Sequence, residues 1–277
     1  MKPVRFDYER PTDLAAAVAL GRRENAVVKF LAGGQSLGPM LNMRLIQPDL
    51  LVDITAIAEL KRVEETSHST ILGSCVTHAD IEDGRVPDAT NGALRKVASG
   101  IAYRAVRNRG TIGGSVVHAD PAADWIAALS ALGAAAVIQG GRRERRVPVE
   151  EFIVGAFETA LTAGELVTGI EIPRQPRGAR WGYYKACRKT GEFAHAIGAF
   201  LHDPARSVCR AVIGATGAKP IVLTDAGKLF NGAVGSPDAL NVPFVRDAMN
   251  ARGMTDTIDQ KMHVAALRRA VAQAHAT

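Results

Sequence analysis

The spacing of apolar and polar residues in the first third of the chain predicts alternating strands and helices. Residues 26–31 (AVVKFL) form a short apolar run that ends at a Gly-Gly pair, as is typical of a buried strand. Leucine recurs every four residues over 37–45, which indicates a short helix, and 50–54 (LLVDI) indicates a second strand. Together these segments predict a βαβ unit with a right-handed crossover. The Ala-rich segment 12–21, with Thr and Asp at its start and Gly at its end, predicts a further helix.

The middle third predicts both strands and helices. The expected strands are 71–74, 134–138, 146–149 and 165–172, and the expected helices are 80–83, 91–101 and 122–132. Asp120 followed by Pro121 favours an N-cap and first helical residue for the last of these helices. The paired glycines between 134–138 and 146–149 predict a hairpin. Its basic tip is either a solvated surface or a contact to a partner, and it carries Arg142, Arg143, Arg145 and Arg146.

A segment rich in Pro, Gly and Arg at 173–180 predicts a linker between two domains. Beyond it, 194–201 and 207–214 predict an antiparallel hairpin, and the pattern after Pro220 predicts a cap of three helices at 224–230, 237–250 and 259–275. We therefore expect an α+β protein. Its expected domains are residues 1–175, in two parts of about 1–57 and 58–175, and residues 176–277, an antiparallel sheet with a helical cap.

Composition supports a folded protein and excludes several classes. The 277 residues are 47% hydrophobic and 22% charged, which is typical of a globular protein. No apolar run reaches the roughly 20 residues that a membrane-spanning helix requires. The basic residues near the start are not followed by the apolar stretch of a secretory signal. The sequence therefore predicts a cytoplasmic protein without a membrane span.

The cysteines and the charge limit the chemistry further. Cys75, Cys187 and Cys209 stand far apart, so we expect no disulfide framework, structural zinc or iron–sulfur cluster within this chain. The net charge of +6 comes from lysines and arginines spread along the chain, with few aromatic residues among them. This distribution favours an anionic cofactor or an acidic partner over nucleic acid.

Two glycine motifs are the candidates for such a cofactor. The first is Ala32-Gly33-Gly34-Gln35-Ser36, and the second is Thr111-Ile112-Gly113-Gly114-Ser115. Glycine lets the backbone approach a ligand closely, and successive N–H groups can then surround a phosphate. Either motif alone is better explained as an ordinary tight turn. Neither is the G-x-G-x-x-G of a Rossmann site or the Lys-containing loop of a nucleotide hydrolase. Two such turns together fit a pyrophosphate held from two sides.

Two longer strings carry a resemblance to a known family. AGGQSLGPMLNMRLIQPDLLVDI (32–54) and RNRGTIGGSVVHADPAADW (107–125) are similar to the two FAD-binding signatures of the flavin subunits of molybdenum hydroxylases. That family includes the medium subunit of carbon monoxide dehydrogenase and the flavin domain of xanthine dehydrogenase. The resemblance covers nearly the whole chain and implies a p-cresol methylhydroxylase-like FAD-binding fold.

The resemblance also implies roles for single residues. The first motif with Leu37 would surround the FAD pyrophosphate, and the second motif would complete the site from the other side. Asp124 would lie near the ribityl or adenosine part, and Val167 would line the adjacent wall. Lys185 would lie near the polar edge of the flavin, with Phe193 beside its ring. Each has another explanation: Asp124 as support for its helix, Phe193 as a core residue and Lys185 as a solvated strand residue.

The function that the resemblance implies is electron transfer within a complex. A large molybdopterin subunit would oxidise the substrate, and a small subunit with [2Fe–2S] clusters would pass electrons to the FAD of this chain. The acceptor would be NAD, a quinone, oxygen or another oxidant, and the assembly a dimer of heterotrimers. Two alternatives remain open. One is a self-contained FAD-dependent oxidase or dehydrogenase of the same superfamily, and the other is a binder of nucleotides or nucleic acid.

Overall fold

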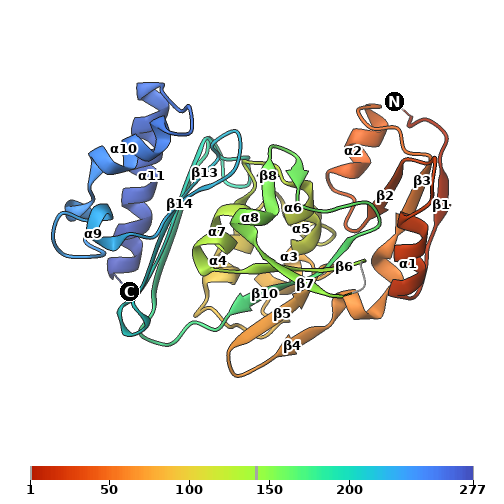
Figure 1. Ribbon diagram of the computed structural model, residues 1–277, viewed down its shortest axis with the longest axis horizontal. Coiled ribbons are helices and arrows are strands. Elements are labelled where there is room, and N and C mark those ends of the chain that lie inside the picture. The colour runs from red at the N-terminus through yellow and green to blue at the C-terminus, as the bar shows by residue number, and fades with distance from the viewer. Residues whose placement is uncertain (1, 141–142, 277) are drawn as a thin grey trace.

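The computed structural model describes residues 2–140 and 143–276, which form three parts side by side (Figure 1). The N-terminal part is a parallel sheet in the order β1-β3-β2 with two helices. Its elements are β1 (Asp7–Glu9), α1 (Leu14–Gly21), β2 (Val28–Leu31), α2 (Leu37–Asn42) and β3 (Leu50–Asp53). The Asp13 carboxylate accepts a hydrogen bond from the N–H of Ala16 at 2.8 Å, which fixes the start of α1. The predicted parallel pair is confirmed, whereas β1, whose residues are all exposed, has no apolar pattern that could have predicted it.

The middle part is built on an antiparallel sheet in the order β4-β5-β10-β6-β7. Its strands are β4 (Val63–Glu65), β5 (Ser69–Gly73), β6 (Ala135–Gln139), β7 (Arg145–Pro148) and β10 (Leu166–Pro173). A small hairpin of β8 (Ile153–Gly155) and β9 (Glu158–Thr159) lies outside it. The helices are α3 (His78–Glu82), α4 (Ala93–Ser99), α5 (Arg104–Arg107), α6 (Ile112–His118), α7 (Asp124–Leu132) and α8 (Val149–Phe152).

Helix α7 lies at the centre of the molecule, and all nine of its residues are buried. Its sequence is apolar on nearly every side, which is typical of a helix that has other elements packed all around it. The predicted start at Asp120 is wrong, because α7 begins at Asp124. The Asp120 carboxylate instead accepts the N–H of Ala122 at 2.9 Å and closes a turn before the helix.

The C-terminal part is a sheet in the order β11-β12-β13-β14, with α7 against one face and α11 against the other (Figure 1). Its strands are β11 (Arg180–Ala186), β12 (Ala196–Asp203), β13 (Val208–Gly214) and β14 (Ile221–Leu223). The predicted hairpin is confirmed as the pair β12 and β13. The sequence analysis missed the flanking strands: the segment after Pro220 continues as β14 before any helix begins.

Three helices cover the outer face of this sheet, namely α9 (Ala226–Leu229), α10 (Val242–Asn250) and α11 (Thr257–Ala276). The single helix predicted over 237–250 is wrong. A short 3-10 turn at Pro237–Ala239 comes first, and the side chain of Asn241 then caps α10 by accepting the N–H of Phe244. The predicted α+β class is confirmed. Among the described helices, none has the length and apolar character to cross a membrane.

The basic tip of the β6–β7 hairpin is partly neutralised. Arg142 lies outside the described residues. Arg145 forms an ion pair with Glu165 at 2.7 Å, and Arg146 pairs with Glu171 at the same distance, so both arginines are tied to the carboxylates of neighbouring β10 or the turn before it. The two side chains are still 37% and 48% exposed, so both belong to the solvated surface as expected, with their charges paired there.

Candidate functional site

The first glycine motif forms the loop between β2 and α2. Gly34 adopts a φ of +71°, a left-handed conformation that glycine reaches without strain. Within the described chain, the N–H groups of Gly34, Gln35 and Ser36 donate no hydrogen bond, and Gln35 and Ser36 are exposed. Leu37, which begins α2, is half-buried. Three successive free N–H groups form the kind of backbone concavity that binds an anion.

The second motif is not a loop but the first turn of α6, with Thr111 as its N-cap. Its amides already have partners in the protein: Ile112 donates to Val76, Gly113 to Ser74, Gly114 to the Thr111 hydroxyl and Ser115 to the Thr111 carbonyl. The predicted cradle of free N–H groups is therefore wrong here. Ile112 is fully buried, so it supports the helix rather than facing a ligand. Sequence reasoning missed the helix because a Gly-Gly pair usually ends one.

The two glycines of this motif have different surroundings. A Cβ on Gly113 would lie 2.4 Å from the Cβ of Ser74, so this glycine allows α6 to pack against the loop after β5. A Cβ on Gly114 would meet only the Thr111 hydroxyl at 2.8 Å and the Cβ of Ala32 at 3.8 Å. Gly114 therefore lies directly beside Ala32 of the first motif, where an added Cβ would be in van der Waals contact with the Ala32 side chain.

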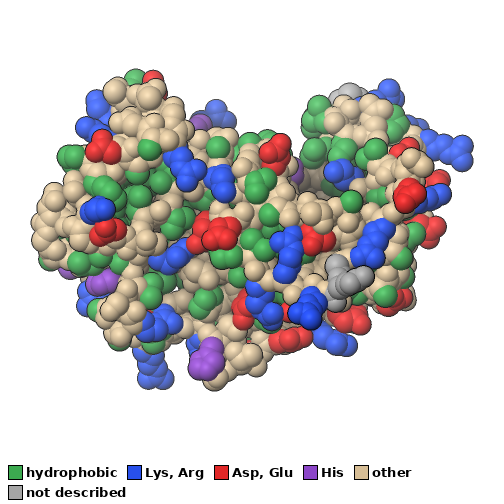
Figure 2. Space-filling view, viewed as in Figure 1, with side chains coloured by type: hydrophobic (Ala, Val, Ile, Leu, Met, Phe, Trp, Pro, Cys, Tyr) green, Lys and Arg blue, Asp and Glu red, His purple; other side chains and the backbone are tan. Residues whose placement is uncertain are grey.

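The two motifs meet between the N-terminal and middle parts, and Figure 2 shows the surface hollowed where these parts adjoin. A Cβ on Gly33 would lie 2.1 Å from the carbonyl oxygen of Arg109, just before the second motif. The hydroxyl groups of Ser36 and Ser115 make no hydrogen bond within the part of the chain that the structure describes. Where the two motifs meet, the chain thus offers three free amides and two free hydroxyl groups.

Asp124 and Lys185 form a buried ion pair. The Lys185 ammonium lies 2.9 Å from Asp124 Oδ1 and 3.1 Å from Oδ2, and the Tyr183 hydroxyl donates to Oδ1 at 2.7 Å. The side chains of Lys185 and Asp124 are only 9% and 8% exposed. Burial raises the pKa of Asp124, while the positive charge of Lys185 opposes that change. Burial and the neighbouring carboxylate also hold the pKa of Tyr183 well above its usual value. The explanation of Lys185 as a solvated residue is wrong.

Phe193 and Val167 differ strongly in exposure. The Phe193 side chain lies in the segment between β11 and β12 and is 66% exposed, so the alternative of a core aromatic is wrong. Val167 lies on β10 and is 1% exposed within the central core. At this exposure neither the side chain nor the backbone of Val167 is open to a ligand, so the structure does not place this residue at the surface of the site.

Sequence reasoning missed Tyr183 and His78. Tyr183 stands two residues before Lys185 on β11, and the alternation of strand side chains places both on one face, which is the signal that could have found it. The buried His78 accepts a hydrogen bond from the indole of Trp125 at 3.1 Å. Burial lowers the pKa of His78 to about 4, so the ring is neutral near pH 7 and supports the core beneath Gly110.

The chain is similar in sequence and in fold to known proteins. Residues 4–175 match the family of the FAD binding domain in molybdopterin dehydrogenase. The chain is 34% identical over 285 aligned positions to the carbon monoxide dehydrogenase medium chain of Afipia carboxidovorans, covering 100% of this chain and 99% of that one. It is 37% identical over 202 residues to the caffeine dehydrogenase subunit beta of a Pseudomonas species, covering 73% and 68%. The solved structure of reconstituted CO dehydrogenase from Oligotropha carboxidovorans matches with a TM-score of 0.87 and 31% identity, covering 100% and 99%.

Both glycine motifs and Asp124 fall within the matched residues 4–175. Lys185 and Phe193 lie beyond that match, in the part that the medium chain of Afipia carboxidovorans also covers. The family inferred from the two sequence strings is therefore confirmed, and the chain belongs to the family of FAD-binding domains of molybdopterin dehydrogenases.

Proposed function

We propose that this chain is the FAD-binding electron-transfer subunit of a heteromeric molybdenum hydroxylase. Its relatives include medium chains and subunits of dehydrogenase complexes, one of them named for carbon monoxide and another for caffeine. A small [2Fe–2S] subunit supplies electrons and a large molybdopterin subunit oxidises the substrate, in a dimer of heterotrimers. FAD held at the two glycine motifs would supply a redox centre able to exchange electrons singly or in pairs, and the acceptor would be NAD, a quinone, oxygen or another oxidant.

The observation that carries the proposal is the fit of the two motifs to a dinucleotide pyrophosphate. The amides of Gly34, Gln35 and Ser36 are free to donate to phosphate oxygens. Gly114 lies beside Ala32 and has no side chain, so at this position nothing from α6 projects toward the first motif. The hydroxyl of Ser115 offers one more donor on the side of α6.

The ion pair of Lys185 and Asp124 is the polar group proposed for the flavin side of the site. Because the Lys185 ammonium is already compensated by Asp124, it contributes a fixed dipole rather than an unpaired charge. The hydroxyl of Tyr183 donates a hydrogen bond to the Asp124 carboxylate and so holds it in place. Phe193 supplies an exposed aromatic face for the ring.

In this proposal the cysteines of this chain bind no metal and no iron–sulfur cluster. Cys75 packs in the N-terminal core and Cys209 in the C-terminal core, and burial raises the pKa of each thiol to about 11. Because these two thiols lie in separate cores, they cannot bind one iron–sulfur cluster together, and the described residues contain no cluster of three or more metal-ligating side chains. The iron–sulfur clusters are accordingly assigned to a partner subunit.

Replacing Gly114 by valine tests the proposed site. A Cβ there already reaches Ala32, so the methyl groups of valine would push α6 and the first motif apart. We therefore expect FAD binding to weaken by at least about 100-fold, or roughly 2.7 kcal/mol. The measurement is a titration of the purified chain with FAD, followed by flavin fluorescence, beside a thermal unfolding curve without FAD.

Gly178→Val is the matched control, because a Cβ on Gly178 meets nothing within 4 Å and the residue lies in the linker before β11. This variant should bind FAD as the unaltered chain does. Retention of full FAD affinity by Gly114→Val would show that the pyrophosphate does not lie between the two motifs.

A further inference from the structure

The segment from Gly100 to Tyr103 is fixed by contacts from two parts of the molecule. The Lys185 ammonium, from the C-terminal sheet, donates to the carbonyl of Gly100 at 2.9 Å. The Arg107 guanidinium, from α5, donates to the carbonyls of Ile101 and Ala102, both at 2.9 Å. Three successive backbone carbonyls are thus held by two cations, so the segment is a rigid part of the structure.

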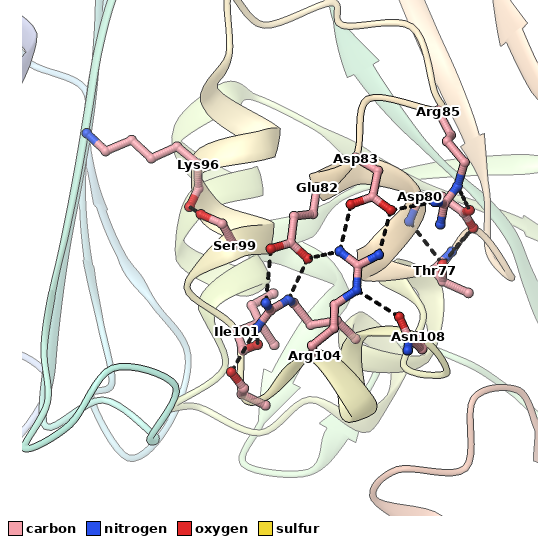
Figure 3. A network of polar contacts seen from close by, with 12 residues as sticks. Thr77, Asp80, Glu82, Asp83, Arg85, Lys96, Ser99, Ile101, Arg104 and Asn108 are labelled. Carbon is pink, nitrogen blue, oxygen red and sulfur yellow. Dashed lines mark hydrogen bonds and ion pairs between the residues drawn. The ribbon is translucent and has the colours of Figure 1, made fainter.

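Arg107 is held in turn by a network of charged residues, of which Figure 3 labels Glu82, Asp83 and Arg104. Glu82 accepts two hydrogen bonds from Arg107, at 2.7 and 2.9 Å, in a bidentate pair. Arg104 binds Asp83 through two nitrogens and also reaches Glu82. The side chains of Arg107 and Glu82 are 12% and 19% exposed, which limits screening by solvent. This network keeps Ala102 at a φ of +44°, a conformation that alanine rarely adopts.

The same segment runs beside the one that carries Phe193. Ile101 and Gly191 form an isolated parallel bridge. Gly191 has a φ of +91°, and a Cβ there would lie 2.6 Å from the Ala102 carbonyl oxygen, so the two backbones are in close contact. Tyr103 and Phe193 each stand two residues beyond the bridged pair. Their side chains are 68% and 66% exposed.

We propose that Tyr103 and Phe193 form an aromatic pair that receives a planar heteroaromatic ring, which in the proposed function is the isoalloxazine of FAD. Two large rings exposed on adjacent rigid segments lose little conformational entropy when a flat ligand covers them. Lys185 connects this pair to the rest of the site, because it binds both Gly100 and Asp124. Tyr103 is the added binding residue, and Arg107 and Glu82 act as positioning residues through the backbone.

Two variants of Tyr103 test this inference on the full chain. Tyr103→Ala should weaken FAD binding by at least about tenfold, and it should leave the inhibition of FAD binding by ADP unchanged because ADP has no flavin ring. Tyr103→Phe keeps the ring and should retain FAD affinity. It should also increase the fluorescence of bound flavin, because a phenol donates an electron to the excited flavin more readily than a phenyl ring does.

Ile258→Ala serves as the matched control, since Ile258 is a large apolar side chain, 73% exposed, at the start of α11. It should change neither FAD affinity nor fluorescence. If the unaltered chain binds FAD and Tyr103→Ala binds it equally well, the aromatic pair is overturned while the proposed function stands. If the unaltered chain binds no FAD, both are overturned.

Discussion

Replacing Lys185 by methionine is expected to lower the free energy of unfolding by roughly 3–5 kcal/mol, because it leaves the Asp124 carboxylate buried without its cation. Asp124 is 8% exposed and its position is fixed by the hydrogen bond from Tyr183, so it cannot turn toward solvent. Chemical denaturation of the chain without FAD measures the effect. The loss of stability is therefore separate from any effect on the cofactor.

The same ion pair determines how the stability of Lys185→Met depends on pH. Removing Lys185 removes the main group that lowers the pKa of Asp124, so burial raises this pKa further. A carboxyl whose folded pKa lies above its unfolded value destabilises the protein at high pH, and the loss diminishes as pH falls through the folded pKa. The stability difference between Lys185→Met and the unaltered chain should therefore narrow as pH is lowered from 7 to 5.

Two comparisons complete this test. In Lys185→Met/Asp124→Asn the carboxylate is gone as well, so the double variant should be more stable than Lys185→Met alone. Lys228→Met removes a surface pair with Asp225 whose side chains are 68% and 51% exposed, and it should change stability by less than about 1 kcal/mol. If Lys185→Met proves as stable as Lys228→Met, the buried ion pair is refuted.

Replacing Gly33 by alanine is also expected to have a large effect, lowering the free energy of unfolding by about 3 kcal/mol or more. The new Cβ would lie 2.1 Å from the Arg109 carbonyl oxygen and 2.8 Å from the Cα of Gly110. Both atoms belong to backbone, which cannot turn aside as a flexible side chain can. The N-terminal part would have to move away from the segment before α6, and limited proteolysis and denaturation should detect the change.

Gly38→Ala is the matched control, in the same region but with nothing within 4 Å of its Cβ. Because Gly38 lies in α2, alanine there should raise stability slightly. The comparison also separates two explanations of Gly33. If its role were only to admit a ligand, Gly33→Ala would be as stable as the unaltered chain when FAD is absent, and the predicted loss would not occur.

Elements with a local signal in the sequence were predictable. The Asp13 cap, the β2–β3 pair and the β12–β13 hairpin each follow from a short stretch of chain. Helix α6 could not be predicted, because its glycines disfavour a helix locally. The contact of Gly113 with Ser74, in another part of the chain, explains why glycine stands at that position. Short strands such as β1 and β14 exist because a neighbouring strand supplies their hydrogen bonds, which the local pattern does not record.

Some features of the candidate site could likewise be predicted from the sequence, and others could not. The first motif could be recognised as a loop with free amides, since strand, glycine pair and helix follow one another in the chain. The partners of Lys185 could not, because Asp124 and Gly100 lie 61 and 85 residues away in the sequence. The exposure of Phe193 could not be predicted either, since an aromatic residue is usually buried and the contact of Gly191 with the distant Ala102 is not visible in the local sequence.

A visible absorption spectrum of the tagged chain, purified gently from its native host, shows whether the chain carries FAD within a molybdenum hydroxylase complex. We expect flavin bands on a broad iron–sulfur background, together with a small and a large subunit that purify with the chain. A colourless protein that also fails to take up added FAD would contradict the account and leave the two glycine motifs as parts of the fold alone.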